Sequence, residues 1–127
     1  MGPTSAELGL AGERLAARLL ARRGMVLLGR RVRTRAGEVD LVFQDGDTLV
    51  CVEVKCASAD PGGRWSPGER FDARALERVS AAARELARRG LGRGRARVDL
   101  VELWIGRRGA PRWRHHVDVG RGARDGR

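Results

Sequence analysis

Aromatic residues are scarce in this sequence: tyrosine is absent, and three tryptophans and two phenylalanines bring the aromatic fraction to only 4%. Proteins that hold single-stranded nucleic acid without reading its sequence stack the bases on aromatic side chains. The composition therefore argues against a stacking platform for single strands.

Cysteine is also rare, and the two residues present, Cys51 and Cys56, lie close together around an apolar run. This arrangement does not resemble a disulfide framework, so we expect a cytosolic location. The chain has no apolar run of about 18 residues and no basic start followed by an apolar core. We expect neither a membrane span nor a secretory signal.

Lysine is almost absent, since Lys55 is the only lysine among 26 cationic residues and the other 25 are arginine. Lysine carries a compact ammonium whose pKa can shift, whereas a guanidinium stays protonated. Lys55 also follows Glu53 by two residues in an apolar strand, where a surface role is hard to explain. The pattern indicates a site that needs an ammonium, although a single lysine must fall somewhere by chance.

Positive charge, in contrast, is abundant: the formal net charge is +10 and the sequence pI is about 11.5. Such a balance favours polyanionic partners, and nucleic acid is the first to consider. A solvated basic surface in an arginine-rich protein explains the same numbers, and composition alone leaves both readings open.

The chain is expected to form one domain over residues 4–118, followed by a disordered basic tail at 119–127. Thr4 and Glu7 have capping-box spacing, an apolar stripe with helical period follows, and Gly24 is a suitable helix end. Glu13 lies at the edge of that stripe among small residues, which would let a ligand approach; an ordinary boundary glutamate is equally compatible.

Expected helices span 4–23 and 72–89, and expected strands span 25–34 (with an irregularity at Gly29), 38–43, 48–55, 96–105 and 112–117. The segment 57–69 is rich in Gly, Pro, Ser and Asp and is expected to be a loop. The order α-β-β-β-α-β, with one further strand, indicates the α/β class with a central mixed sheet flanked by helices.

Alternation within strand 48–55 places its three valines on one face and Cys51, Glu53 and Lys55 on the other. If Asp45-Gly46 is a two-residue hairpin loop, Asp40 lies opposite Cys51 and diagonal to Glu53. Cross-strand partners share a face of the sheet, so Asp40, Glu53 and Lys55 are expected to converge.

The same register places Glu38 opposite Glu53, which would require a cation or a proton between the two carboxylates. We favour the simpler interpretation that Glu38 borders the turn, leaning into solvent or pairing with an arginine. Carboxylates that hold Mg²⁺, with an ammonium nearby, are the parts that phosphodiester hydrolysis needs. A structural Glu–Lys pair on a strand is the alternative.

The hairpin segment GEVDLVFQDGDTLVCVEVK resembles the core motif of the YraN-like family of uncharacterised bacterial proteins. That family is related to Holliday-junction resolvases within the PD-(D/E)XK nuclease superfamily. Gly12-Glu13, followed by Ala16 and Leu20, resembles the first-helix motif of the family. Arg97-Val98-Asp99 resembles the start of the strand after the second helix, and the resemblance covers roughly residues 4–105.

The resemblance implies a restriction-endonuclease-like core with metal binding at Asp40 and Glu53, a catalytic role for Lys55 and an accessory carboxylate at Glu13. The implied cofactor is Mg²⁺, with Mn²⁺ as a substitute. Val39 stands where the superfamily name has proline, a departure that this branch tolerates.

A cation on the second helix often faces the substrate in such folds, which makes Arg74 and Arg78 candidate substrate-binding residues. Asp99 is expected to cap or pair structurally. His115 and His116 are adjacent on a strand and point to opposite faces, so they are interpreted as structural.

Two functions are therefore expected to compete. One is a Mg²⁺-dependent endonuclease acting on DNA, with branched or damaged DNA as a candidate substrate. The other is a nucleic-acid-binding module with the same fold and little or no cleavage. The Asp, Glu and Lys set favours the enzyme, since a pure binder gains nothing from carboxylates that face a phosphate. Resolvase-like enzymes usually act as dimers, so the resemblance also suggests a homodimer, but no segment indicates a dimer surface.

Overall fold

The computed structural model describes residues 2–58, 66–106 and 110–120. Its elements are the helices α1 (Ser5–Arg22) and α2 (Ala73–Arg88), the short 3₁₀ helix η1 (Pro67–Arg70), and the strands β1 (Val26–Thr34), β2 (Gly37–Asp45), β3 (Thr48–Ser58), β4 (Arg95–Ile105) and β5 (Arg112–His116). The predicted order of elements is confirmed, including the fifth strand.

The strands form one mixed sheet in the order β1-β2-β3-β4-β5. Strands β1, β2 and β3 make an antiparallel meander, β3 and β4 run parallel, and β5 returns antiparallel to β4. The parallel pair needs a crossover, and η1 and α2 provide it. This is the arrangement of a restriction-endonuclease-like α/β core, as expected.

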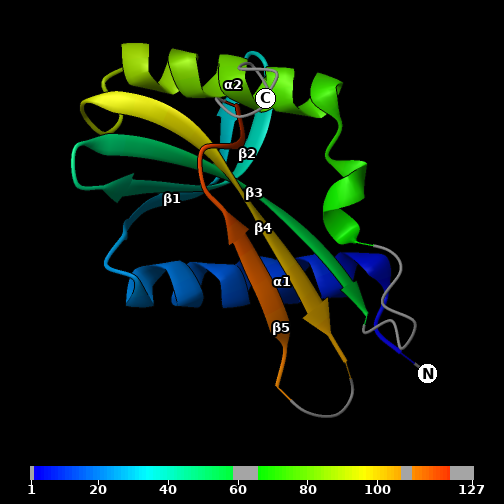
Figure 1. Ribbon diagram of the computed structural model, residues 1–127. Helices are drawn as coiled ribbons and strands as arrows, with labels where there is room; N and C mark the ends of the chain where they lie inside the picture. The colour runs from blue at the N-terminus through cyan, green and yellow to red at the C-terminus, as the bar shows by residue number, and fades with distance from the viewer. Residues whose placement is uncertain (1, 59–65, 107–109, 121–127) are drawn as a thin grey trace.

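The two helices cover opposite faces of the sheet (Figure 1). The core on the α1 side contains Ala16, Leu20, Phe43, Val50 and Val52, with Val54 packed against it. The core on the α2 side is a separate cluster that includes Cys51, Val79, Leu86 and Val98. The predicted division of strand β3 into a valine face and a face with Cys51 is therefore confirmed.

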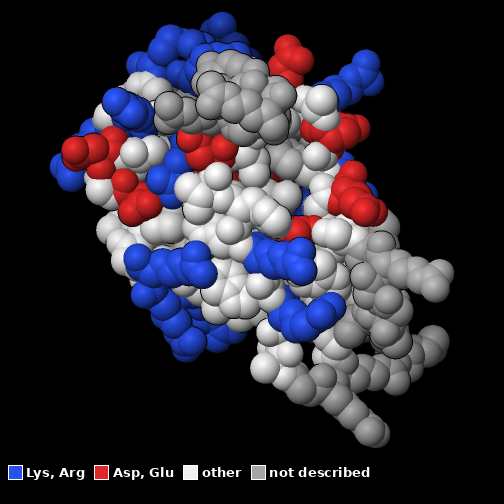
Figure 2. Space-filling model, in the orientation of Figure 1, with Lys and Arg blue, Asp and Glu red and all other residues white. Residues whose placement is uncertain are grey.

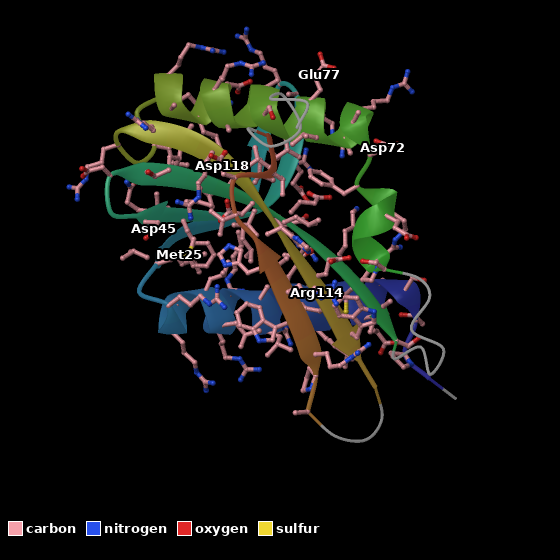
Figure 3. The ribbon with its side chains drawn as sticks, viewed as in Figure 1. Met25, Asp45, Asp72, Glu77, Arg114 and Asp118 are labelled. Carbon is pink, nitrogen blue, oxygen red and sulfur yellow. The ribbon has the colours of Figure 1, made fainter. Side chains whose placement is uncertain are left out.

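Helix boundaries follow local chemistry. Thr4 caps α1 with both hydrogen bonds of a capping box, and Gly24 follows that helix at φ +92°. Asp72 accepts a hydrogen bond from the Ala75 N–H at the start of α2, and Figure 3 labels this residue. Gly90 follows α2 at φ +81°.

In β1 the register of pairing with β2 shifts between Leu27 and Gly29, which is the predicted irregularity.

The predicted hairpin register is wrong by two residues. Asp45 pairs with Thr48, so the loop is Gly46-Asp47 and paired residue numbers sum to 93 rather than 91. Gly46 adopts φ +56°, a conformation that glycine enters at little cost. Because the error is an even number, the β3 side chains keep their predicted faces, with Val52 on the α1 side and Cys51 on the α2 side.

The expected loop at 57–69 is partly structured, because β3 extends to Ser58 and η1 begins at Pro67; residues 59–65 lie outside the described part of the chain. Of the expected tail, Val119 packs against the α2-side core, and residues 121–127 lie outside the description. Cys51 and Cys56 are both free thiols. Neither of the two described α-helices is long and apolar enough to cross a membrane.

Candidate active site

The candidate site lies where strands β2 and β3 separate. The β2–β3 ladder ends at the pair Leu41–Val52, whereas the β3–β4 ladder continues to Ser58–Ile105. Residues 53–58 of β3 therefore have β4 on one side and no β2 partner on the other. Backbone groups on such an edge need other partners, and side chains that reach them are held in a fixed geometry.

Asp40 supplies the first of those partners. Its Oδ2 accepts the backbone N–H of Val54 at 2.9 Å, which fixes the carboxylate beside the open end of the ladder. Asp40 and Glu53 are the next residues beyond the last ladder pair, Leu41–Val52, and their side chains are close enough to interact. Burial, followed by the negative charge of Glu53, raises the pKa of Asp40 from 3.8 to about 6; the Val54 N–H and Lys55 oppose this rise only in part.

Glu53 and Lys55 complete the centre. Lys55 Nζ lies 3.0 Å from Glu53 Oε2, and the glutamate side chain is only 8% exposed against 25% for the lysine. Two carboxylates thus share a single ammonium in a half-buried setting. Lys55 also lines a cavity of about 370 Å³ between the end of β3, the first turns of α1 and η1. The three residues predicted to converge do so.

Glu13 lies nearby but has a different partner. Its Oε1 accepts a hydrogen bond from Arg31 Nε at 3.2 Å. The β1–β2 pairs on either side place Arg31 across from Asp40, so Glu13 reaches the edge of the site through this arginine. Small residues around Glu13 do permit close packing, since a Cβ on Gly12 would stand 2.9 Å from Cys56 Cβ.

Glu38 does not face Glu53, because the predicted opposition depended on the incorrect register. It is exposed and lies 3.9 Å from Arg33 Nε on the neighbouring strand, which is the arginine pairing favoured as the simpler interpretation. The carboxylates that meet in the site are therefore Asp40 and Glu53.

Arg74 and Arg78 are exposed on the first turns of α2. Arg78 lies over the start of β2, because a Cβ on Gly37 would stand 3.2 Å from its Cδ. On the face shown in Figure 2, arginine side chains gather at the levels of both helices, with acidic side chains scattered between them. Arg78 therefore covers the start of β2 on the α2 side of the sheet.

Asp99 and the two histidines occupy the neighbouring strands. Asp99 is fully buried and pairs with Arg97 and with His115, whereas His116 points to the other face and meets Glu102 at 2.7 Å. Adjacent strand residues do point to opposite faces, as predicted. Asp99 has the structural pairing that its sequence context indicated.

Sequence reasoning missed Glu102 and Arg70, both beside the site. Glu102 is 3% exposed on β4 and is the ladder neighbour of Lys55. Arg70 ends η1 and donates a hydrogen bond to Cys56 O at 3.1 Å. A signal for Glu102 was present, because it is a second carboxylate in the apolar run of β4. Arg70 had none, since its position depends on how η1 packs.

The donor set fits a hard divalent cation better than zinc. Among the described residues, no group of three or more His, Cys, Asp or Glu side chains is arranged to hold a metal ion. Zinc usually requires three or four protein ligands, whereas Mg²⁺ is commonly bound by one or two carboxylates and several waters. Asp40 and Glu53 provide two carboxylates and an uncompensated negative charge, so they suit Mg²⁺ or Mn²⁺.

Comparison with other proteins gives the family. Residues 12–103 match the uncharacterised protein family UPF0102. A UPF0102 protein of Streptomyces griseus is 45% identical over 115 residues, covering 85% of this chain and 91% of its own length. A UPF0102 protein of Anaeromyxobacter dehalogenans is 45% identical over 112 residues, covering 85% and 79% respectively. The YraN-like resemblance is confirmed, and the chain belongs to the UPF0102 family.

Proposed function

We propose that this protein is a metal-dependent endonuclease that hydrolyses phosphodiester bonds in DNA. The observation that carries the proposal is the meeting of Asp40, Glu53 and Lys55 at the point where β2 and β3 separate. The pKa of Asp40 is raised first by burial and then by the negative charge of Glu53, and two carboxylates facing one ammonium leave a deficit of positive charge. A divalent cation would remove it.

Asp40 and Glu53 would hold the ion, Mg²⁺ or Mn²⁺. A bound divalent ion offsets the charge that develops on a phosphate and makes water more acidic. Asp40 is kept in place by the Val54 N–H, so this ligand is already oriented before the substrate arrives. Glu53 is held from the other side by Lys55.

Lys55 would act on the phosphate and on the attacking water. Its ammonium has three donors, of which one faces Glu53, and Lys55 is among the residues that line the cavity at the end of β3. It can therefore donate to a phosphate oxygen while it remains paired. Glu13 would act as an accessory carboxylate once a substrate draws Arg31 away from it.

The substrate is proposed to be DNA, with branched or damaged DNA as the specific class. The net charge of +10 favours any polyanion, and Arg74 and Arg78 extend the cationic surface from the site along α2. A homodimer would present two sites to a symmetric junction.

A binding module without cleavage is the second candidate. It is favoured by the two ion pairs Glu53–Lys55 and Glu13–Arg31, which already neutralise two of the three carboxylates. In that case the acidic residues would serve the fold alone.

One experiment separates the two candidates. Supercoiled plasmid, a labelled linear duplex and a labelled four-way junction are incubated with Mg²⁺, Mn²⁺ or EDTA. The wild type is compared with Asp40→Ala, Lys55→Ala and the distant surface variant Arg88→Ala. Cleavage that requires the metal and is lost only in the two site variants supports the enzyme. Salt-sensitive binding without cleavage on all substrates supports the binding module.

A further inference from the structure

The buried carboxylate of Glu102 fastens η1 to the sheet. Its Oε2 accepts the Gly68 N–H at 2.7 Å, and its Oε1 lies 2.7 Å from His116 Nε2. The residue is 3% exposed, so these bonds offset a large cost of removing the charge from water. Both oxygens are thus engaged in holding neighbouring segments.

Gly68 makes this contact possible. A Cβ at that position would stand 2.5 Å from Glu102 Oε2, closer than any side chain tolerates. The backbone of η1 therefore sits directly on the carboxylate, and its place on the sheet is defined by a short contact rather than by loose packing.

Arg70 ends this fastened segment. Its Nη2 donates to Cys56 O at 3.1 Å, on the stretch of β3 that lies beyond the β2 ladder. Lys55 and Glu102 are ladder neighbours on β3 and β4. The position of Arg70 next to Lys55 therefore depends on the bond between Glu102 and Gly68.

Arg70 and Lys55 line the same cavity of about 370 Å³. Ser5 and Ser58 also line it, and no Asp or Glu is among the described residues that do. Arginine, lysine and serine are residue types whose side chains can donate hydrogen bonds to the oxygens of a phosphate group. The described residues that line the cavity include two cationic residues, Lys55 and Arg70, and the cavity adjoins the acidic pair.

The cavity is displaced from the carboxylates along β3. Asp40 is bonded at Val54 and Arg70 at Cys56, two residues further on, which is roughly 7 Å along an extended strand. That separation is enough to place two phosphate groups at distinct positions, one at the acidic pair and the next at Arg70.

We propose that this cavity binds the DNA phosphate that flanks the scissile one, with Arg70 as its ligand and Glu102 as the positioning residue that holds Arg70 there. The proposal rests on the proposed nuclease function for the identity of the substrate. It adds a subsite on η1 and a buried residue on β4 that acts through it.

The test measures binding separately from cleavage. Fluorescence anisotropy of a labelled four-way junction is recorded from about 50 to 200 mM salt, with Ca²⁺ in place of Mg²⁺. The variants are Arg70→Gln, Glu102→Gln and the double variant. Arg88→Gln is the matched control, because Arg88 ends α2, roughly 24 Å along the helix from its first residue, Ala73. Melting temperatures establish that each variant is folded.

Arg70→Gln is expected to weaken binding about 5- to 10-fold and to reduce the slope of log K against log salt by about 1, because one phosphate contact is lost. Glu102→Gln is expected to weaken binding similarly. The double variant should bind no more weakly than Arg70→Gln alone, because Glu102 acts through Arg70. Arg88→Gln should remain within about twofold of wild type.

The outcomes separate the two proposals. Unchanged affinity and salt slope in Arg70→Gln would overturn the subsite, whatever the cleavage result. Additive losses in the double variant would overturn the positioning role of Glu102. If no DNA is cleaved but Arg70→Gln still loses affinity and slope, the nuclease proposal fails and the phosphate subsite stands. If Glu102→Gln does not fold, Arg70→Lys, which keeps the charge but not the bond geometry, serves as the second variant and should recover only part of the affinity.

Discussion

Asp99 is fully buried in the sheet and Asp40 is partly buried, and the surroundings of these two aspartates differ sharply. Asp99 receives hydrogen bonds from Arg97, His115 and the Asp118 N–H, and Arg97 reaches on to Asp45; Figure 3 labels Asp45 and Asp118. Burial alone would raise the pKa of Asp99, but the bonds from His115 and Arg97 outweigh burial and lower it. At Asp40 burial and Glu53 prevail, and the pKa rises.

The two aspartates differ in the source of the positive charge that balances each carboxylate. Around Asp99 the protein itself supplies it through Arg97. His115 adds a further donor, because Arg23 donates to His115 Nδ1 at 3.1 Å and leaves the Nε2 proton for Asp99. Around Asp40 the protein supplies one ammonium for two carboxylates. A carboxylate satisfied from within indicates a structural role, and one left short of positive charge indicates a role that a cation from outside completes.

The largest effect is expected on the rate of DNA cleavage when Lys55 is replaced. Lys55→Arg keeps the charge but replaces a compact ammonium with a planar guanidinium, in a site that is only 25% exposed. We expect cleavage to fall by about 10² to 10³-fold, the scale for loss of a transition-state donor. Single-turnover cleavage in Mg²⁺ measures it, and Arg88→Lys is the matched control. A rate within threefold of wild type would show that the sole lysine is incidental.

Asp99→Asn is expected to damage stability rather than chemistry. It leaves Arg97 and His115 with a neutral partner inside the sheet, which should cost about 3 kcal/mol in the free energy of unfolding at pH 7. Because the pKa of Asp99 is lowered, its contribution is present above about pH 4 and is lost as the pH falls below that. Urea unfolding at several pH values measures it; a loss below about 1 kcal/mol would contradict the structural role.

Asp40→Asn is expected to increase the free energy of unfolding above about pH 6, whereas Asp99→Asn should decrease it. The folded pKa of about 6 lies above 3.8, so wild-type stability in EDTA falls as the pH rises from about 4 to 6. The variant lacks this fall and keeps an acceptor for the Val54 N–H. It should be more stable than wild type at pH 8 by about 1 to 3 kcal/mol, with equal stability near pH 4. A variant that is less stable than wild type at pH 8 would mean that Asp40 serves the fold.

The smallest effect is expected when Arg78 is replaced. It is exposed and lies over Gly37 at the start of β2, so it can contact one phosphate of bound DNA. Arg78→Gln should weaken binding about two- to threefold and reduce the salt slope by up to about 1. Anisotropy titrations with Arg88→Gln alongside measure the effect, and an unchanged slope would remove Arg78 from the interface.

The sequence was sufficient for the elements and for the face that each side chain occupies. Alternation in β3 separated the valines from Glu53 and Lys55, and this held although the hairpin register was wrong by two residues. The register depends on whether Asp45-Gly46 or Gly46-Asp47 forms the two-residue loop, and the two loops differ little in free energy. A period-two pattern is unaffected by such an even shift.

The sequence could not place residues whose partners come from distant segments. Glu102 accepts a hydrogen bond from Gly68 of η1, and Glu13 accepts one from Arg31 of β1. Neither contact follows from the spacing of residues within one element. The histidines were correctly assigned to opposite faces by alternation, but their partners, Asp99 and Glu102, depended on the β4–β5 pairing. Side-chain faces are local properties, whereas contacts across elements are not.

The proposed metal site at Asp40 and Glu53 is tested most directly by a Mn²⁺ titration followed by electron paramagnetic resonance at pH 7.5. The proteins compared are the wild type, Asp40→Asn and the control Glu38→Gln. Saturable binding of Mn²⁺ is expected in wild type and in Glu38→Gln, with competition by Mg²⁺, and that binding should be lost in Asp40→Asn. Absence of saturable binding in wild type, or equal binding in Asp40→Asn, would contradict the claim that Asp40 and Glu53 form a metal site.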